Sequence, residues 1–387
     1  MAPPDASEED DAADRTYVRR PNSLVGLVEP ADEMEHVLLR QNAGIAPVLR
    51  LRRGATVIGR ADGCDLVLTG GDVSRRHCQF DLVGVEVIAG GEVLLTDLGS
   101  TNGTFVDGTK VTQAVALTPG SRISVGGHQL LYERRSRREL DEAEALEREL
   151  HRANQYVLAI LPLPLREGPV QAEWYYLPCT SLGGDAFGYR DLGGGMYAGY
   201  ILDVAGHGVG AAMHSVSVAN VLRQDGMLGA DLRDPAAVMT RLNESFPMET
   251  HDGLFFTAWY WVYDLGRRVL TYCSAGHHAG YVKGLGAREA KPLQARNPAI
   301  GFMPGVRFRS ERVDIAQGST LYLFSDGVFE IEDAAQRRWA IEDFVAILGE
   351  PPRAGVTEPQ RIFERVREAS RPGPLDDDFS LVAIRFP

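Results

Sequence analysis

A stretch without glycine or proline, Arg134 to Leu161, divides this chain into regions of different character. Its apolar residues alternate three and four positions apart, which is the a/d spacing of a coiled coil; they are Ala143, Leu146, Leu150, Ala153, Val157 and Ile160. Pro162 and Pro164 follow and cannot continue a helix. The spacing predicts a linker helix over 134–161. Its stripe could pair with a second copy of the chain or pack on the chain's own C-terminal region.

Before this helix, the sequence consists of short β-rich runs separated by turn residues. From Pro47 to Glu133 such runs recur at near-regular spacing, and glycines such as Gly59 and Gly99 punctuate them. This pattern is typical of an all-β sandwich. The segment 1–46 begins with an acidic run and lacks clear periodicity. Roughly its first twenty residues are predicted to be disordered, and Leu24 to Gln41 is predicted to form a short helix.

After the helix, from residue 162 to 387, strands alternate with helices, which predicts a mixed α/β region. The predicted helices are Met213–Arg223, Pro235–Phe246, Ile341–Leu348 and Pro359–Ser370. The chain therefore divides into four parts: 1–46, 47–133, 134–161 and 162–387. A chain of 387 residues is too long for one ordinary core, so a multidomain fold is expected.

Composition excludes several classes of protein. The net charge of −13 argues against a nucleic-acid partner and against binding to an anionic membrane. No apolar run approaches the roughly 18 residues that span a bilayer, and the acidic N-terminus does not resemble a secretory signal. The four cysteines are scattered without metal-ligand spacing, which predicts reduced core thiols in a cytoplasmic protein; they are Cys64, Cys78, Cys179 and Cys273.

Four acidic motifs carry the chemistry of the C-terminal region. They contain Asp185, Asp203, Asp326 and Asp377. An isolated Asp-Gly pair is more often an ordinary turn than a metal site. However, three of these aspartates stand at the ends of apolar strands, so they can converge on one edge of a sheet. Carboxylates are suited to Mg²⁺ or Mn²⁺, and their mutual repulsion calls for a cation. The pattern predicts a two-metal site that activates water.

Three loops of the N-terminal region supply groups that hold a phosphate: Gly59-Arg60, Ser74-Arg75-Arg76-His77 and Gly99 to Thr104. Together, in this order, they make the stretch Pro47 to Glu133 resemble a forkhead-associated (FHA) domain, a family that binds phosphothreonine peptides. The resemblance implies that Arg60 and Ser74 contact the phosphate, and that the peptide backbone is framed by Arg75, Thr101 and Asn102. It also implies that His77 supports the loop instead of touching the ligand.

The region from about Leu158 to Phe386 resembles the metal-dependent protein phosphatases (PPM, or type 2C), in particular the bacterial branch typified by the stage II sporulation phosphatase. The resemblance rests on Ile160–Pro162, Ser181–Asp185, Asp203–Val209, Ser274–His277, Tyr322–Val328 and Asp377–Val382. It implies an α/β/β/α sandwich. The whole chain is therefore expected to be a multidomain protein with an all-β FHA sandwich, a coiled-coil-like linker helix and an α/β/β/α PPM-type phosphatase sandwich.

The same resemblance assigns roles. Asp203 would bridge two metal ions, the backbone carbonyl of Val204 would ligate one, and Asp185 would act near the first ion, largely through water. Asp326 and Asp377 would hold the second ion, with the choice between Asp377 and Asp378 left open. The candidates to protonate the leaving oxygen are His207 and His277, and a structural role in their loops is the alternative. One departure is Gly188, where the family often has an acidic residue.

These resemblances predict a protein serine/threonine phosphatase that uses two or more Mn²⁺ or Mg²⁺ ions and is targeted by its FHA domain. Substrates would be phosphoserine or phosphothreonine proteins, and the FHA domain would take a phosphothreonine peptide or an autophosphorylated kinase. A homodimer through the linker helix is a further expectation. The alternative is an inactive phosphopeptide-binding scaffold, against which the retained aspartates argue. The sequence lacks a Cys-x5-Arg motif, which excludes a cysteine phosphatase, and the absence of a P-loop and of a kinase motif set argues against a kinase or ATPase.

Overall fold

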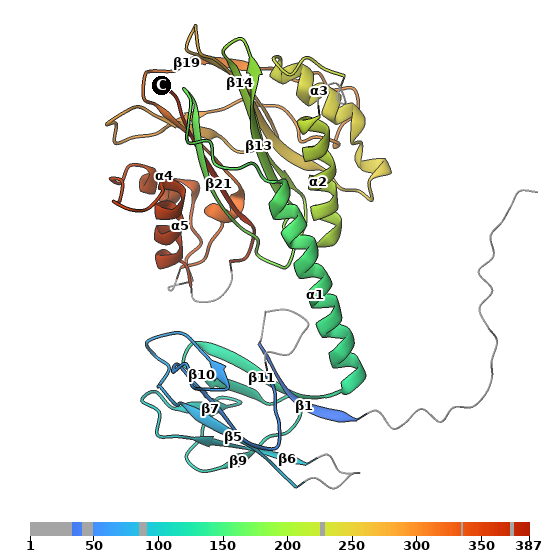
Figure 1. Ribbon diagram of the computed structural model, residues 1–387, viewed down its shortest axis with the longest axis vertical. Helices are drawn as coiled ribbons and strands as arrows, with labels where there is room; N and C mark the ends of the chain where they lie inside the picture. The colour runs from blue at the N-terminus through green and yellow to red at the C-terminus, as the bar shows by residue number, and fades with distance from the viewer. Residues whose placement is uncertain (1–32, 41–48, 85–90, 225–228, 334–335, 372–374) are drawn as a thin grey trace, which may run out of the picture.

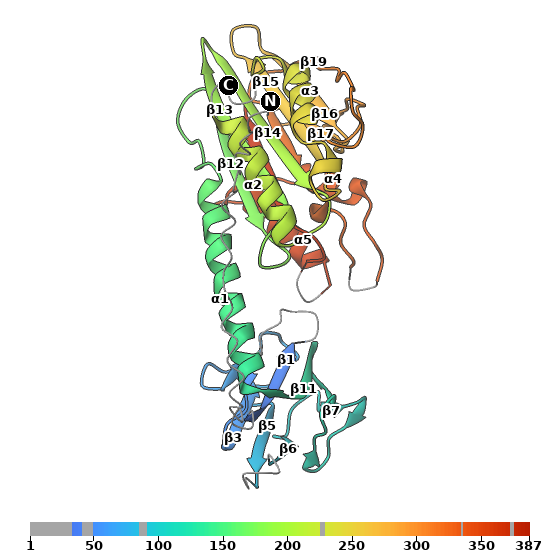
Figure 2. The ribbon, with the colours of Figure 1, turned by 90° about the vertical axis from the view of Figure 1, so that its right-hand side faces the viewer.

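The computed structural model describes residues 33–40, 49–84, 91–224, 229–333, 336–371 and 375–387. Two β-sandwiches are joined by one long helix, α1 (Arg137–Ile160) (Figures 1 and 2). The expected multidomain architecture is confirmed. Among the described residues, no helix combines the length and the apolar character that crossing a bilayer requires.

The N-terminal sandwich has two sheets. One has the order β2-β1-β11-β10-β7-β8 and consists of β1 (Met34–Arg40), β2 (Leu49–Arg50), β7 (Thr104–Val106), β8 (Thr109–Lys110), β10 (Arg122–Val125) and β11 (His128–Ser136). The other has the order β4-β3-β5-β6-β9 and consists of β3 (Gly54–Gly59), β4 (Leu66–Val67), β5 (Cys78–Val83), β6 (Glu92–Asp97) and β9 (Val115–Ala116). Alternate apolar residues of both sheets form one core, as a half-buried strand pattern requires.

The short helix predicted over Leu24 to Gln41 is wrong where the structure describes it, because β1 is a strand. All seven of its residues pair with β11 in antiparallel register. Val37 and Leu38 are fully buried, and the ring of His36 lies 2.6 Å from the Tyr132 hydroxyl. Tertiary pairing therefore overrides local propensity here. The sandwich includes β1, so it begins before residue 47; residues 1–32 and 41–48 lie outside the described part.

Helix α1 begins at Arg137 instead of Arg134, since β11 continues to Ser136. Ser136 is the N-cap: its hydroxyl accepts from the Glu139 amide, and the Glu139 carboxylate accepts from the Ser136 amide. This reciprocal capping satisfies two otherwise unpaired amides and fixes the helix start. At the other end, the chain leaves the helix at Leu161, ahead of Pro162.

The C-terminal sandwich also has two sheets. One has the order β13-β14-β15-β16-β19 and consists of β13 (Asp185–Gly193), β14 (Met196–Val204), β15 (Phe256–Asp264), β16 (Val269–Ala275) and β19 (Glu311–Asp314). The other has the order β12-β21-β20-β17-β18 and consists of β12 (Gln171–Leu177), β17 (Gly280–Lys283), β18 (Lys291–Leu293), β20 (Thr320–Phe324) and β21 (Phe379–Arg385). We call these the β14 sheet and the β21 sheet.

Helices cover the outer face of each sheet, so the layers are α/β/β/α. Helices α2 (Val209–Arg223) and α3 (Pro235–Ser245) pack on the β14 sheet, and α4 (Ile341–Leu348) and α5 (Glu358–Ala369) pack on the β21 sheet. The inner faces meet in a core that includes Trp259 and Trp261. The four predicted helices are confirmed. Two short 3-10 turns, η1 (Met248–Thr250) and η2 (Asp326–Val328), complete the region.

Candidate functional site

The two sheets of the C-terminal sandwich bring four aspartates together from distant parts of the sequence. Asp185 and Asp203 are register partners on β13 and β14, whereas Asp326 follows β20 and Asp377 precedes β21. The aspartates thus come from two facing sheets, and the expectation that they share one edge of one sheet is wrong. The Ser380 hydroxyl on β21 donates to Asp185 Oδ2 at 2.6 Å and ties the sheets together at this point.

Burial and mutual repulsion raise the pKa values of these carboxyls. Burial raises the pKa of Asp203 to about 8, and the negative charges of Asp326 and Asp377 add to this effect. Burial and the nearby Asp377 raise the pKa of Asp326 to about 6. Burial and Asp203 raise the pKa of Asp185 well above its ordinary value. A cluster of carboxyls that resist ionisation is a site where a bound cation would be strongly stabilised.

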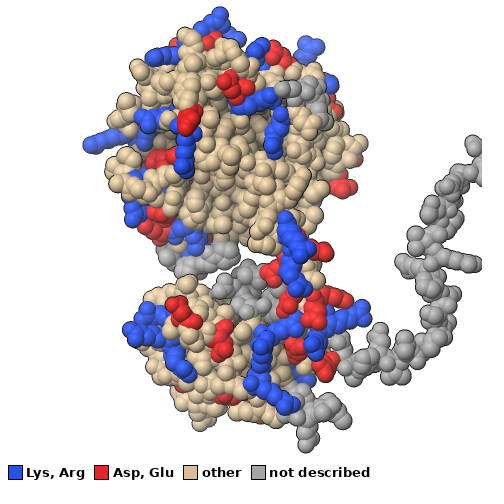
Figure 3. Space-filling model, in the orientation of Figure 1, with Lys and Arg blue, Asp and Glu red and all other residues tan. Residues whose placement is uncertain are grey.

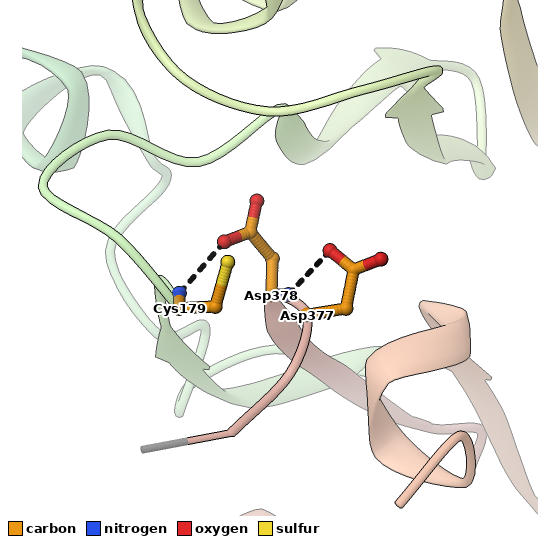
Figure 4. A group of neighbouring side chains, drawn as sticks. All are labelled: Cys179, Asp377 and Asp378. Atoms are coloured by element: carbon orange, nitrogen blue, oxygen red, sulfur yellow. Dashed lines mark hydrogen bonds between the residues drawn. The ribbon is translucent and has the colours of Figure 1, made fainter. Parts of the chain in front are cut away.

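The three consecutive aspartates before β21 have different partners. Asp376 pairs with the guanidinium of Arg371. The Asp378 carboxylate accepts two amides, from Cys179 at 2.8 Å and Gly184 at 2.7 Å, and is almost fully buried. Asp377 is exposed, and its Oδ1 accepts from the Asp378 amide at 2.8 Å (Figure 4). Only one oxygen of Asp377 therefore accepts a backbone amide among the described residues, whereas both oxygens of Asp378 do.

Glycines allow the loop of Asp377 and Asp378 to lie close to the neighbouring loops. A Cβ on Gly183 would lie 2.5 Å from Asp378 Oδ2, and one on Gly327 would lie 2.3 Å from the Asp378 carbonyl oxygen. Any other residue at these positions would push the acidic loop away from the sheet ends. A Cβ on Gly184 would lie 3.1 Å from the Val204 carbonyl oxygen. The Val204 carbonyl therefore lies within the same acidic loop cluster.

The two candidate proton donors differ in their surroundings. His207 is exposed and lies near Asp377, whose pKa is raised by burial while the charge of His207 opposes that rise. Burial and the adjacent His278 hold the pKa of His277 well below its ordinary value, and the two rings lie 4.2 Å apart. The His277 carbonyl accepts from Ser274 Oγ within the same loop. The role of either histidine as a proton donor stays a prediction.

Sequence reasoning did not single out two residues near the cluster. The sulfur of Cys179 and carboxylate oxygens of Asp377 and Asp378 lie within 4.8 Å of one another (Figure 4). Burial and Asp378 raise the pKa of this thiol to about 12, so it stays protonated. Glu330 lies near Asp326 and raises its pKa. Glu330 follows Asp326 closely in the sequence, so this spacing could have indicated that Glu330 lies near the cluster. No sequence pattern links Cys179 to Asp377 and Asp378, which lie far along the chain.

In the N-terminal sandwich, the residues predicted to bind a phosphopeptide lie on loops that converge. The Arg60 amide donates to the Ser74 carbonyl at 3.0 Å, and the Thr101 amide donates to Ser74 Oγ at 3.0 Å. Asn102 donates to the Asp72 carbonyl at 2.8 Å. The side chains of Arg60, Arg75, Thr101 and Asn102 are exposed, and Ser74 is half-buried. The structure therefore brings all five residues together on one surface, which we call the reader loops.

His77 supports these loops from inside. It is fully buried; its Nδ1 accepts from the Ser74 amide at 3.1 Å, and its Nε2 lies 3.2 Å from the Gly103 carbonyl. The interpretation of His77 as a loop support is consistent with both contacts. Gly59 allows the end of β3 to lie close to the backbone of Arg75, because a Cβ at this position would lie 2.3 Å from the Arg75 carbonyl oxygen.

Comparison with known families agrees with this geometry. A family model described as stage II sporulation protein E (SpoIIE) matches residues 193–387, half of the chain. The chain belongs to the SpoIIE family. The SpoIIE match includes Asp203, His207, Asp326 and Asp377 and begins after Asp185. A second model, the FHA domain, matches residues 56–126 and covers all the reader loops.

Individual relatives match one region or the other. This SpoIIE-family chain is 29% identical over 188 residues to the phosphoserine phosphatase RsbP of Bacillus subtilis (strain 168), across 47% of the chain and 45% of RsbP. It is 35% identical over 113 residues to the FHA domain-containing protein FhaB of Mycolicibacterium smegmatis (strain ATCC 700084 / mc(2)155), across 28% of the chain and 69% of FhaB. The chain thus spans less than half the length of RsbP.

A solved structure shows the same fold. The SiaA-PP2C domain of Pseudomonas aeruginosa superposes with a TM-score of 0.55 over 63% of this chain and 98% of that domain, at 23% sequence identity. At this identity the likeness concerns the fold alone. It agrees with the α/β/β/α layers described above for the SpoIIE-family region.

Proposed function

We propose that this chain is a metal-dependent protein serine/threonine phosphatase whose FHA domain reads phosphothreonine. The observation that carries the proposal is the convergence of four aspartates from two sheets, with the pKa of Asp203 raised to about 8. The mutual repulsion of these carboxylates is relieved when divalent cations bind between them. The similarity to RsbP, named a phosphoserine phosphatase, supports the same activity. The alternative of an inactive scaffold is disfavoured because all four aspartates are retained together.

The donor set fits hard divalent cations. Asp203, the Val204 carbonyl and Asp185 would hold one side of a dinuclear Mn²⁺ or Mg²⁺ centre, and Asp326 with Asp377 the other. All are oxygen donors, which these ions prefer. When bound, the ions would supply an activated water and stabilise charge on the phosphoryl oxygens. We assign Asp377 instead of Asp378 to the centre, because both oxygens of Asp378 already accept backbone amides.

The side chains around the centre have their own tasks. His207, exposed beside Asp377, would donate a proton to the leaving serine or threonine oxygen. Asp378 positions the loop of Gly184 and the start of β21, and Ser380 orients Asp185 through its 2.6 Å hydrogen bond. Glu330 adds negative charge near Asp326, which would strengthen cation binding at that side.

The reader loops fit a phosphorylated partner. Arg60, Ser74, Arg75, Thr101 and Asn102 would bind a phosphothreonine peptide, for example on an autophosphorylated kinase, in the cytoplasm. Phosphothreonine carries about −1.5 to −2 charges, which matches the exposed guanidinium groups of Arg60 and Arg75. The relative FhaB, named for its FHA domain, supports this assignment. Substrate proteins would then be held near the catalytic region by a second phosphorylated residue.

Substitution of Asp203 tests the catalytic proposal. With Mn²⁺ and a phosphothreonine peptide as substrate, Asp203→Asn should lower kcat by about 100-fold or more, because metal stabilisation of the transition state amounts to several kcal/mol. Asp376→Asn is the matched control, since Asp376 pairs with Arg371 outside the cluster, and it should retain activity. Wild-type turnover in excess EDTA, or normal turnover by Asp203→Asn, would show the proposal to be wrong.

A folding measurement accompanies this test. The pKa of Asp203 is about 8 in the metal-free protein, so its negative charge increasingly opposes folding as the pH rises toward and through that value. Asn carries no charge, and metal-free Asp203→Asn should therefore unfold at the same temperature as the wild type or higher at pH above about 8. Loss of turnover in a variant of unchanged or raised stability then reports on catalysis and not on misfolding.

A further inference from the structure

A cavity of about 360 Å³ lies where α1 meets the C-terminal sandwich, between the end of α2 and the outer face of β13 and β14. Its apolar lining includes Ile160 and Pro162 at the end of α1 and Leu222 near the end of α2. Small residues on the sheet, Gly188 and Ala198, leave room for it. The aspartate cluster does not line this cavity, which therefore belongs to neither of the sites described above.

One polar side chain in this cavity lacks a partner. Tyr200 is only 7% exposed, and its hydroxyl makes no hydrogen bond with any described residue. A buried hydroxyl without a partner is destabilising, because it has lost its hydrogen bonds to water without replacing them. The neighbouring Tyr260 differs, because its hydroxyl donates to the Leu232 carbonyl at 2.9 Å. The ring of Tyr200 rests against Gly188, where a Cβ would lie 2.8 Å from the hydroxyl.

Two arginines stand at the mouth of the cavity. Arg223 Nη1 donates to the Ile160 carbonyl at 3.0 Å, and Arg190 Nη1 donates to the Arg223 carbonyl at 3.2 Å. Tyr200 and Arg223 line the same cavity. Burial raises the pKa of the Tyr200 hydroxyl, and the positive charge of Arg223 opposes that rise. Asp191 also lines the mouth, with its carboxylate accepting from the Gly193 amide at 2.7 Å. Among the described lining residues, the charged ones are Arg190, Arg223 and Asp191.

We propose that this cavity binds a small organic carboxylate with an apolar body. The carboxylate would accept hydrogen bonds from the Tyr200 hydroxyl and the Arg223 guanidinium, and the apolar body would contact Leu222 and Pro162. A guanidinium has five N–H donors in a fixed fork that matches a carboxylate. The volume lies within the range of small-molecule sites, which are mostly apolar with a few placed polar groups.

A carboxylate bound in this cavity would also affect the end of α1. Arg223 holds the carbonyl of Ile160, the last residue of the helix. A carboxylate on the same guanidinium therefore changes how the end of α1 is held. We expect bound carboxylate to alter amide hydrogen exchange at residues 157–161 and to leave exchange in the N-terminal sandwich unchanged. This expectation does not depend on the activity of the metal centre.

The test uses the full chain and three probes of different shape: octanoate, phenylacetate and 3-phenylpropionate. The corresponding uncharged amides are the controls. At least one acid should bind saturably below about 10 mM, the range expected for ligands of this size, and more tightly than its amide. Binding is measured by saturation-transfer NMR and calorimetry. Failure of all three acids to bind saturably would overturn the proposal.

Two substitutions locate the site. Tyr200→Phe should weaken binding by roughly three- to tenfold and should keep or raise the unfolding temperature, because it removes an unpaired buried hydroxyl. Arg223→Gln should remove the preference for acid over amide. Arg385→Gln, an exposed arginine at the end of β21, is the matched control and should bind as the wild type does. If Tyr200→Phe binds the acids as tightly as the wild type, the cavity is not the site, whatever Arg223→Gln does.

Discussion

At the scale of single residues, the run Asp376 to Asp378 shows how identical side chains acquire different roles. Asp376 pairs with Arg371, Asp378 accepts the amides of Cys179 and Gly184, and Asp377 is exposed and accepts only the amide of Asp378. The sequence predicted one metal-binding aspartate here but could not say which, because the partners that distinguish them lie almost two hundred residues away. Hydrogen bonding, and not residue type, distinguishes the three side chains.

Paired substitutions in this run should separate binding from structure. Asp377→Asn should raise the Mn²⁺ concentration needed for half-maximal activity by about tenfold or more, since metal affinity depends on ligand charge. Asp378→Asn should instead remove an ionised acceptor of two buried amides, a loss of about 1.5–3 kcal/mol, so its unfolding midpoint should fall by roughly 3–12 °C. Metal titration of activity and thermal unfolding by circular dichroism measure the two effects. The reverse pattern would reassign the ligand to Asp378.

At the scale of elements, the reader loops show that connections can be more ordered than their glycines suggest. The loops before β4, β5 and β7 are joined by backbone hydrogen bonds such as Arg60 to Ser74, and His77 braces them from the core. A rigid sandwich thus presents several exposed polar side chains in fixed positions. This arrangement reduces the entropy lost on binding a peptide.

Arg60→Ala and Ser74→Ala should each weaken binding of a phosphothreonine peptide by roughly tenfold or more, because a charge-assisted contact contributes about 1.5–3 kcal/mol. Arg53→Ala is the matched control: Arg53 precedes β3 and Arg60 follows it, so the two lie at opposite ends of that strand. Calorimetry on the full chain is the measurement, because β1 belongs to the sandwich and a fragment starting at Pro47 would lack it. Equal affinity for the unphosphorylated peptide would exclude the reader role.

At the scale of the whole molecule, α1 is anchored to both sandwiches. Near its start, Arg50 of β2 pairs with Asp141 at 2.9 Å and Glu144 at 2.7 Å, and charged side chains crowd this part of the helix in Figure 3. Near its end, Val157 packs with Leu182 and Ala212 of the C-terminal sandwich. The helix therefore contacts both regions through described side chains.

The apolar residues along α1 differ in their surroundings. Leu150 and Val157 pack on the chain's own C-terminal sandwich, so the interpretation of self-packing holds for that half. Leu146 is 44% exposed, and Ala153 is also exposed. The homodimer remains a prediction, and the surface left for it is the Leu146 side of the helix.

Leu146→Asp should therefore convert a concentration-dependent dimer to monomer, because a charge in an apolar seam is costly to bury. Arg148→Asp introduces the same side chain on another face of α1 and should leave the dimer intact. Sedimentation velocity over a range of micromolar concentrations measures both. A wild-type chain that stays monomeric at the highest concentration would rule out pairing through this helix.

The sequence by itself determined the parts of this protein and their chemistry. Glycine-punctuated β runs predicted the first sandwich, spacing predicted α1, and strand-end aspartates predicted a metal centre, because these signals are local periodicities and side-chain properties. Only the tertiary structure decided that residues 34–40 are a strand, that the aspartates come from two sheets, that Asp378 is buried while Asp377 is exposed, that Cys179 lies beside both of them and that Tyr200 lines a cavity. Each of these depends on contacts between residues far apart in sequence, which no local pattern records.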